Sequence, residues 1–276
     1  MTSQANAGED LKKFLDANQY SRKSILRYEK IFGRTYVSTG GETTTSEFCA
    51  EMGLKAGMKV LDVGSGIGGS AFFMASKYGV EIDGVDLSSN MVDIAQDNLK
   101  TMPANVQEKV SFRVADAITM DYPENHYDLV YSRDTILHIE DKKSLFQHFF
   151  KCLKPGGQVV ITDYCRGDLG KLDKEDYSQD FKDYVAERGY HLLTVAAYGN
   201  VLTEAGFSDV QAQDRTNQFI EILHKELDGF KKIREEVVEE YSVDDYEHIC
   251  QGWEDKVVRC SNGDQAWGYF VGKKNE

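Results

Sequence analysis

The stretch Lys59-Val-Leu-Asp-Val-Gly-Ser-Gly-Ile-Gly-Gly69 decides the fold of this 276-residue chain. Its first half is mostly apolar, as is typical of a buried strand, and its glycines follow the spacing Gly64-x-Gly66-x-x-Gly69. Glycines at these positions permit a tight turn and let a ligand approach the backbone closely. Residues 70–78 then have a helical pattern, so the stretch predicts a strand, a ligand-binding turn and a helix.

Short apolar runs and helical stretches continue to alternate along the chain. Further strands are expected at residues 81–86, 110–114, 127–131 and 158–162, and helices at 88–99 and about 142–153. Ser88 is a suitable N-cap for the first helix, and Lys154-Pro-Gly-Gly157 is expected to end the second. Strands that alternate with helices at this spacing indicate a parallel sheet with crossover helices.

The pattern changes after residue 163. Residues 173–205 look helical, Ala205-Gly-Phe-Ser-Asp-Val210 predicts a turn into a strand, residues 217–259 form an acidic helical stretch, and residues 267–272 predict a last strand. This last strand would return to the sheet after the helical excursion. The first 58 residues also look helical and loop-like, so we expect them to form a lid over the mouth of the sheet.

The charge balance and the cysteines narrow the classes of partner. The chain carries 46 acidic and 32 basic residues, a net charge of −14. Because nucleic-acid phosphates repel acidic surfaces, a nucleic-acid partner is not expected. The five cysteines are scattered and form no CxxC pair, so neither a disulfide framework nor a metal site is expected. They are Cys49, Cys152, Cys165, Cys250 and Cys260.

Residues 1–10 are polar, and no apolar run approaches the ~18 residues that span a bilayer. We therefore expect a cytoplasmic protein that is not inserted in a membrane. The chain has three prolines and no low-complexity linker or internal repeat, which favours a single domain over residues 1–276. The oligomeric state stays open, with a monomer as the expectation.

Three acidic residues lie at or near the ends of predicted strands, where a cofactor would bind. Asp86 closes the second strand and can bond ribose hydroxyls. Asp62 precedes the glycine turn, where it suits the ammonium of an amino-acid tail but would repel a pyrophosphate. Asp116 follows the third strand and could accept a hydrogen bond from an adenine amino group. Together these acids favour S-adenosylmethionine over NAD, although Asp62 and Asp86 could instead merely cap loops.

The order of these elements, with a fifth strand after Lys154-Pro155 and a late final strand, resembles that of the class I S-adenosylmethionine-dependent methyltransferases. The resemblance implies a Rossmann-like α/β fold with a mostly parallel seven-stranded sheet and helices on both faces. In that fold, residues 1–58 would form an N-terminal helical lid. Residues 59–276 would form the core, with a helical insertion at about 217–259.

Several strings outside the glycine turn carry a more specific resemblance. They are Asn18-Gln-Tyr20, Tyr28-Glu-Lys-Ile-Phe-Gly33, Val37-Ser-Thr-Gly-Gly41, Tyr131-Ser-Arg-Asp-Thr-Ile-Leu-His138, Ile161-Thr-Asp-Tyr164, Arg188-Gly-Tyr190 and Trp267-Gly-Tyr-Phe270. Together they resemble the phosphobase (phosphoethanolamine) N-methyltransferases over nearly the whole chain. The resemblance implies N-methylation of phosphoethanolamine and/or its mono- and dimethyl derivatives, which leads to phosphocholine.

The resemblance also implies roles for individual residues. Tyr20 and His138 would form a catalytic pair that closes the lid, with Asp134 close to the amine. The implied cofactor-binding residues are Val37, Ser38, Asp62, Gly64, Ser65, Gly66, Asp86, Leu87, Asp116, Ala117 and Arg133. The implied substrate-binding residues are Gln19, Tyr20, Tyr28, Asp134, Tyr164, Arg188, Tyr190 and Lys256. Ala117 departs from the pattern, because an isoleucine-like side chain would pack better on adenine.

The chemistry of methyl transfer to an amine agrees with these residue types. The nitrogen must present a free lone pair, and deprotonating an alkylamine of pKa near ~10 at pH 7 costs roughly 4 kcal/mol. His138 follows the fourth strand and can accept a proton or orient another group. A phosphate needs cations and hydroxyls from separate segments, because the chain has no Walker-type loop.

Two other functions stay open. One is a methyltransferase for another small molecule, such as a sterol, a quinone or an amino acid. A bulky apolar acceptor would want an open hydrophobic mouth, whereas the tyrosines, Arg188 and Lys256 favour a compact anion. The other is a non-catalytic S-adenosylmethionine-binding module, against which an intact Tyr20, Asp134 and His138 argue.

Overall fold

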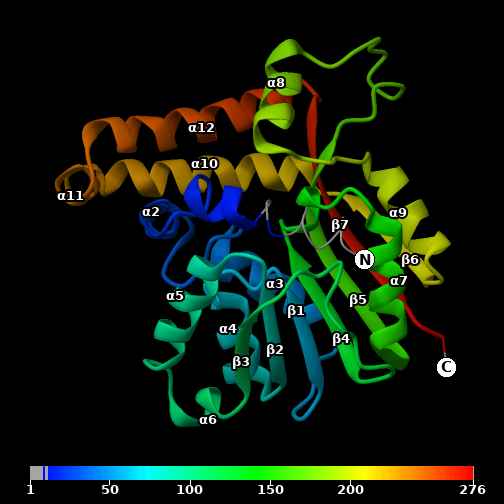
Figure 1. Ribbon diagram of the computed structural model, residues 1–276. Coiled ribbons are helices and arrows are strands. Elements are labelled where there is room, and N and C mark those ends of the chain that lie inside the picture. The colour runs from blue at the N-terminus through cyan, green and yellow to red at the C-terminus, as the bar shows by residue number, and fades with distance from the viewer. Residues whose placement is uncertain (1–8, 10–11, 276) are drawn as a thin grey trace.

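The centre of the computed structural model, which describes residue 9 and residues 12–275, is a seven-stranded sheet in the order β3-β2-β1-β4-β5-β7-β6 (Figure 1). The strands are β1 (Lys59–Val63), β2 (Glu81–Asp86), β3 (Val110–Val114), β4 (Tyr127–Arg133), β5 (Leu153–Arg166), β6 (Ser208–Asp214) and β7 (Gln265–Lys273). Neighbouring strands pair in parallel from β3 to β5, whereas β7 is antiparallel to both β5 and β6. The prediction of a mostly parallel seven-stranded sheet is confirmed.

Helices cover both faces of the sheet because alternate strand residues are buried on opposite sides. In β1, Val60 belongs to one apolar cluster and Leu61 to the other. The helices that contribute to the first cluster include α3 (Gly41–Glu51), α4 (Gly69–Tyr78), α5 (Ser89–Leu99) and α6 (Ala104–Gln107). Those that contribute to the second are α7 (Lys142–Cys152) and α9 (Val195–Glu204). The predicted helix at 88–99 is confirmed, and Ser88 Oγ accepts a hydrogen bond from Met91 N at its start.

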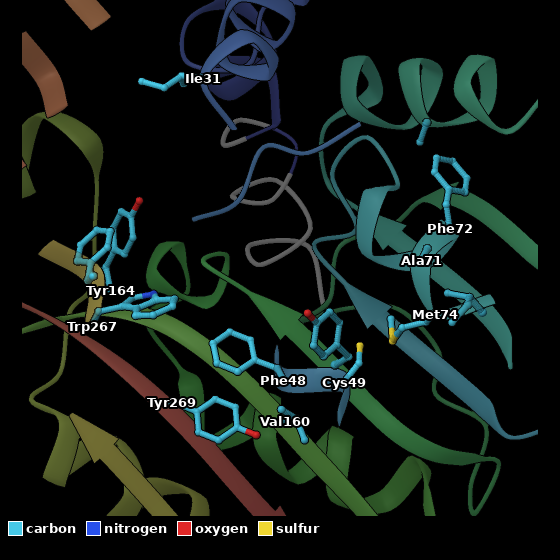
Figure 2. Close-up of a cluster of buried hydrophobic side chains, with 14 of the residues drawn as sticks. Ile31, Phe48, Cys49, Ala71, Phe72, Met74, Val160, Tyr164, Trp267 and Tyr269 are labelled. Carbon is cyan, nitrogen blue, oxygen red and sulfur yellow. The ribbon is translucent and has the colours of Figure 1, made fainter. Parts of the chain in front are cut away.

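Aromatic side chains join the first cluster to the last strand (Figure 2). Phe48 of α3 stacks on Tyr269 with ring centroids 4.8 Å apart, and its ring also lies 6.0 Å from that of Trp267. All three side chains are almost fully buried. They pack β7 against α3 and hold Trp267 close to the end of β4, where its Nε1 lies 2.9 Å from Oδ1 of Asp134.

The helix expected at about 142–153 ends at Cys152, just before Lys154-Pro-Gly-Gly157, as predicted. The fifth strand is longer than expected, because β5 begins at Leu153 instead of residue 158, and Gly156 N and Gly157 O bond to Lys274. Residues 173–205, which look helical in the sequence, contain two helices. α8 (Gln179–Arg188) ends before an irregular segment that pairs with the chain near Leu137, and α9 begins at Val195.

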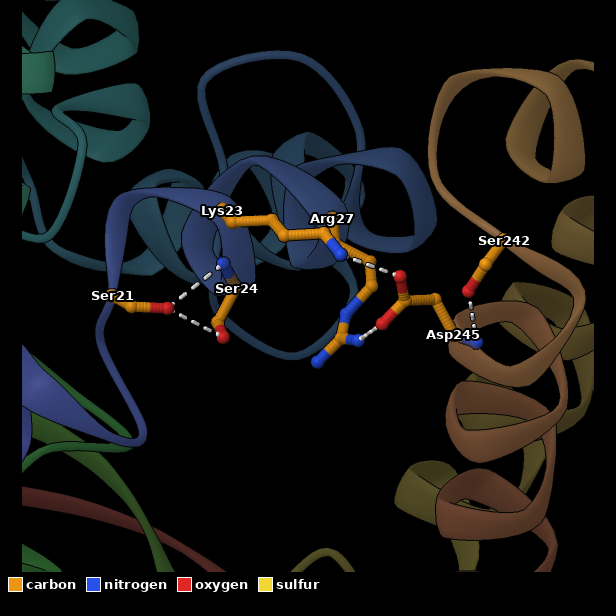
Figure 3. A network of polar contacts seen from close by, with 6 residues as sticks. All are labelled: Ser21, Lys23, Ser24, Arg27, Ser242 and Asp245. Carbon is orange, nitrogen blue, oxygen red and sulfur yellow. Dashed lines mark hydrogen bonds and ion pairs between the residues drawn. The ribbon is translucent and has the colours of Figure 1, made fainter.

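The acidic stretch between β6 and β7 is helical, as predicted. It comprises α10 (Thr216–Lys232), α11 (Arg234–Glu240) and α12 (Val243–Ser261), with α10 and α12 packed side by side (Figure 1). The N-terminal α2 (Arg22–Phe32) lies along α10. It is fastened to α12 by the ion pairs of Lys23 and Arg27 with Asp245 (Figure 3). None of the helices in the described ranges is both long and apolar enough to cross a bilayer.

Candidate functional site

The glycine turn lies between the end of β1 and the start of α4, where two other segments pass close to it. A Cβ atom on Gly64 would lie 2.1 Å from Thr135 Oγ1, and one on Gly66 would lie 2.9 Å from Val37 Cγ2. Both glycines also have positive φ, 76° and 54°. The turn therefore needs glycine for its backbone conformation and for the approach of the segments that carry Val37 and Thr135.

A cavity of about 700 Å³ opens above this turn. It is lined by every residue that the sequence singled out for cofactor, substrate or catalysis: Gln19, Tyr20, Tyr28, Val37, Ser38, Asp62, Gly64, Ser65, Gly66, Asp86, Leu87, Asp116, Ala117, Arg133, Asp134, His138, Tyr164, Arg188, Tyr190 and Lys256. These residues come from segments spread over most of the chain. The fold thus brings them to one place, and their individual roles stay predictions.

Two buried carboxyl groups lie beneath the cavity. Oδ2 of Asp62 is buried without a hydrogen-bond partner among the described residues, and so is Oγ of Ser65. Burial, with the nearby Asp86, raises the pKa of Asp62 to about 7. A cationic ligand group would supply the partner that Asp62 lacks, so the carboxyl fits a ligand with an ammonium.

Asp86 is held differently. Its carboxylate accepts hydrogen bonds from Ser88 N at 2.9 Å and Gly66 N at 3.0 Å, so it also stabilises the glycine turn. Burial raises the pKa of Asp86 to about 6, against the effect of these amides. Its place at the end of β2 is the one that suits ribose hydroxyls.

The third acid, Asp116, also lines the cavity. Asp116 Oδ1 accepts a hydrogen bond from Ile118 N at 2.8 Å, and both Ala117 and Ile118 line the cavity. The branched apolar side chain that seemed to be missing at position 117 is thus present one residue later. This side of the cavity therefore combines an acceptor with an apolar surface, as an adenine ring requires.

Arg133 is almost fully buried, and its guanidinium holds the segment that crosses above the turn. It donates to Thr44 Oγ1 at 2.8 Å, to Thr45 Oγ1 at 3.0 Å and to the carbonyl of Thr39. These bonds fasten the residues that follow Val37 and Ser38. Arg133 is consequently a rigid part of the cavity wall.

Asp134, the residue that follows β4, is held by three parts of the chain. Its Oδ2 accepts from Thr39 N at 3.0 Å, and its Oδ1 accepts from Trp267 Nε1 at 2.9 Å and Thr162 Oγ1 at 3.3 Å. The backbone at Asp134 is left-handed, with φ of 48°. A carboxylate fixed in this way presents its oxygens at a defined point in the cavity.

Tyr20 and His138 form the predicted pair. The tyrosine oxygen lies 3.0 Å from His138 Nε2, and the two rings meet edge to face. Burial lowers the pKa of His138 to about 4, helped by the positive charges of Lys142 and Arg188, and burial raises the pKa of Tyr20 well above 10. At neutral pH the pair is therefore an uncharged imidazole and an uncharged phenol.

At the other end of the cavity, cations are surrounded by aromatic rings. Lys256 Nζ lies 3.8 Å from the ring centre of Trp253, and Arg188 lies 5.9 Å from that of Tyr184. Burial lowers the pKa of Lys256 to about 8. The nearby carboxylate of Glu226 already accepts bonds from Gly40 N and Trp253 Nε1.

In the described part of the chain these cations form no ion pair, because no carboxylate lies within ion-pair distance of Arg188 or Lys256. The charge of Glu226 nonetheless acts on Lys256 and opposes the fall of its pKa. Gln19 Nε2 donates to the hydroxyls of Tyr20 and Tyr190, at 3.2 and 3.5 Å. We call Gln19, Tyr28, Tyr164, Arg188, Tyr190 and Lys256 the cationic cup. Its charges can be neutralised by an anion from outside the protein.

The structure adds residues that the sequence analysis did not single out. Tyr184 and Arg259 line the cavity, with the guanidinium 3.9 Å from the tyrosine ring centre. The sequence contained a signal for both residues. Tyr184 lies one helical turn before Arg188, and Arg259 lies one turn after Lys256, so each shares a helix face with a predicted site residue. Trp267, which donates to Asp134, begins one of the strings that carry the family resemblance, but the sequence assigned it no role. The rim also includes His191 and His248, which are exposed.

Comparison with known proteins gives a consistent picture. Residues 42–212 match a family model described as a methyltransferase domain. The chain is 49% identical over 263 residues to phosphoethanolamine N-methyltransferase 1 of Arabidopsis thaliana, covering 95% of this chain and 52% of that protein. It is 38% identical over 280 residues to phosphoethanolamine N-methyltransferase of Plasmodium falciparum (isolate 3D7), covering all of both. The chain thus spans about half the length of the plant relative.

A solved structure agrees with these relatives. Phosphoethanolamine N-methyltransferase 2 of Haemonchus contortus, in complex with phosphomonomethylethanolamine and S-adenosylhomocysteine, superposes with a TM-score of 0.90 at 34% identity. The superposition covers 96% of this chain and 60% of that one.

The lowered pKa of His138 predicts a pH-dependent contribution to stability. The unfolded chain protonates this imidazole near pH 6.5 and the folded chain near pH 4, so the contribution is present above pH 6.5 and is lost as the pH falls toward 4. Urea unfolding at pH 7.5 and 5 of the wild type and of His138→Asn measures it. Between pH 7.5 and 5, the free energy of unfolding of the wild type should fall by about 2 kcal/mol more than that of the variant. An equal fall in the free energy of unfolding of the two proteins would show that the pKa of His138 is the same in the folded and the unfolded chain.

Proposed function

The chain belongs to the phosphoethanolamine N-methyltransferase family, and we propose that it transfers methyl groups from S-adenosylmethionine to the nitrogen of phosphoethanolamine and/or its mono- and dimethyl derivatives, toward phosphocholine. In each step the nitrogen lone pair forms the new N–C bond while the methyl–sulfur bond breaks. The observation that carries this proposal is the cationic cup in the same cavity as the glycine turn. A sterol or a quinone has no group that would neutralise Arg188 and Lys256.

The cofactor end of the cavity fits S-adenosylmethionine. When bound, this molecule supplies an activated methyl group. Asp62, with its unpartnered oxygen, would bind the ammonium of the methionine part. Asp86 would bond the ribose hydroxyls, and Asp116 with Ile118 would hold the adenine.

Asp134 would receive the amine of the acceptor. Its carboxylate can accept a hydrogen bond from an ammonium and orient the nitrogen, while its three protein donors keep it from following the substrate. Tyr20 and His138 line the same cavity, where the tyrosine would cover the reacting groups. The uncharged imidazole of His138 can accept a hydrogen bond from the phenol of Tyr20 and so orient it.

The cationic cup would bind the phosphate. Arg188 can donate two parallel hydrogen bonds to phosphate oxygens, and Lys256 adds a point charge. The hydroxyls of Tyr28, Tyr164 and Tyr190 supply further donors. A phosphate held here leaves the short ethanolamine chain to reach from the cup to Asp134, so the cup selects the acceptor by charge and by length.

The proposal is tested with purified protein, S-adenosylmethionine labelled in its methyl group, and four acceptors: phosphoethanolamine, its monomethyl and dimethyl derivatives, and ethanolamine. We expect label in one or more phosphobases and none in ethanolamine. Arg188→Met should raise the apparent KM for the phosphobase about 10–100-fold, because a charged hydrogen-bonding group is lost.

The control for this variant is Lys182→Met on the same helix, where the lysine pairs with Asp176 at the surface. This control variant should leave the apparent KM for the phosphobase and that for S-adenosylmethionine unchanged. No transfer to any phosphobase by the wild type would contradict the proposed function. Transfer to ethanolamine as fast as to phosphoethanolamine would contradict the role of the cup.

The pKa of Asp62 predicts how cofactor affinity depends on pH. Its carboxyl titrates near 7 in the free protein and must be charged to pair with an ammonium, so affinity for S-adenosylmethionine should fall as the pH drops from 8 to 6.5. Asp62→Asn should bind about 10–100-fold more weakly at pH 8 and show little change over this window. Titration calorimetry measures both, with the exposed Asp97→Asn as the control. The same pH slope in Asp62→Asn and wild type would assign the titration to another group.

A further inference from the structure

Lys142 at the start of α7 is a lysine with an unusual environment. Its side chain is 3% exposed, whereas most lysines lie at the surface. Nζ donates to three backbone carbonyls: Ile139 O at 2.6 Å, His191 O at 2.7 Å and Ile136 O at 2.9 Å. All three ammonium hydrogens are therefore used, and each carbonyl would lose this partner if the ammonium were removed.

The three carbonyls belong to two segments of the site. Ile136 and Ile139 lie at the two ends of the 3-10 turn η1 (Ile136–His138), which carries His138. His191 follows Tyr190, whose ring meets that of His138 edge to face at 5.1 Å. The backbone of His191 also donates to Leu137 O at 2.7 Å. A single ammonium thus links the turn with the imidazole to the segment that begins at the cationic cup.

The charge of Lys142 also acts on His138. The groups that face the imidazole are the phenols of Tyr20 and Tyr190, the cations of Lys142 and Arg188, and the ring of His191. Burial is the largest cause of the lowered pKa of His138, and the charge of Lys142 is the next. Behind the lysine lies the buried Asp163, whose carboxylate is bonded by Tyr164 N and Tyr198 OH.

We propose that Lys142 is a positioning residue for methyl transfer: its ammonium binds the carbonyls at both ends of the turn that carries His138 and so fixes His138 against Tyr190 and the cationic cup. The inference rests on the proposed function of this site. A purely structural lysine would stabilise the fold without affecting the kcat of the folded protein. Replacing a positioning lysine changes both the pKa of His138 and the kcat.

The test compares Lys142→Met, Lys142→Arg and the wild type in two measurements. The pKa of His138 is followed by NMR in histidine-labelled protein, with His138→Asn to assign its signal, and kcat is measured with a phosphobase. In Lys142→Met the pKa of His138 should rise by about one, because a nearby like charge is removed. Its kcat should fall about 10–100-fold through misplacement of the imidazole. Lys142→Arg keeps the charge and should keep the wild-type pKa.

The matched control is Lys143→Met, which removes a neighbouring lysine that pairs with Glu204 at the surface and should change neither value. If Lys142→Met does not fold, Lys142→Gln replaces it, since it keeps two N–H donors without the charge, and the same results are expected. An unchanged His138 pKa in the uncharged variant would overturn the proposal, even with a lower melting temperature. The NMR titration needs no turnover, so an inactive wild type would refute the proposed function separately.

Discussion

The carboxylate of Asp134 is the point on which the site depends. It joins the N-terminal segment through Thr39, the centre of the sheet through Thr162 and the last strand through Trp267. The left-handed backbone of Asp134 costs on the order of 1 kcal/mol, which the three hydrogen bonds offset. Because these partners lie up to 133 residues away in the sequence, the proposed amine-binding position exists only when the whole fold is assembled.

Because of burial, the two ends of the cavity favour ligand groups of opposite charge. Among the described residues, Oδ2 of Asp62 has no hydrogen-bond partner, and Arg188 and Lys256 form no ion pair with a carboxylate. One end is thus prepared for a cation and the other for an anion. The ammonium of the proposed cofactor would satisfy the first and the phosphate of the proposed acceptor the second, within a protein whose net charge of −14 would otherwise repel phosphates.

Sequence patterns predicted the fold where local and tertiary preferences agree. The β1 stretch, the glycine turn and the Ser88 cap were correct because each depends on neighbouring residues. The start of the fifth strand was placed too late because the pairing of Gly156 and Gly157 with Lys274, at the other end of the chain, overrides their turn composition. In the site, family resemblance named residues with hydroxyl, acidic or basic groups. The sequence assigned no role to Trp267 or Lys142, because their roles arise from contacts with distant backbone and side chains, which no local pattern contains.

The most direct measurement of the central claim is a crystal structure of this protein with S-adenosylhomocysteine and phosphoethanolamine bound together. The account predicts the acceptor nitrogen within hydrogen-bond distance of Asp134, the phosphate between Arg188 and Lys256, and the sulfur above the glycine turn. A phosphate bound outside the cationic cup, or a nitrogen directed away from Asp134 and the sulfur, would contradict it.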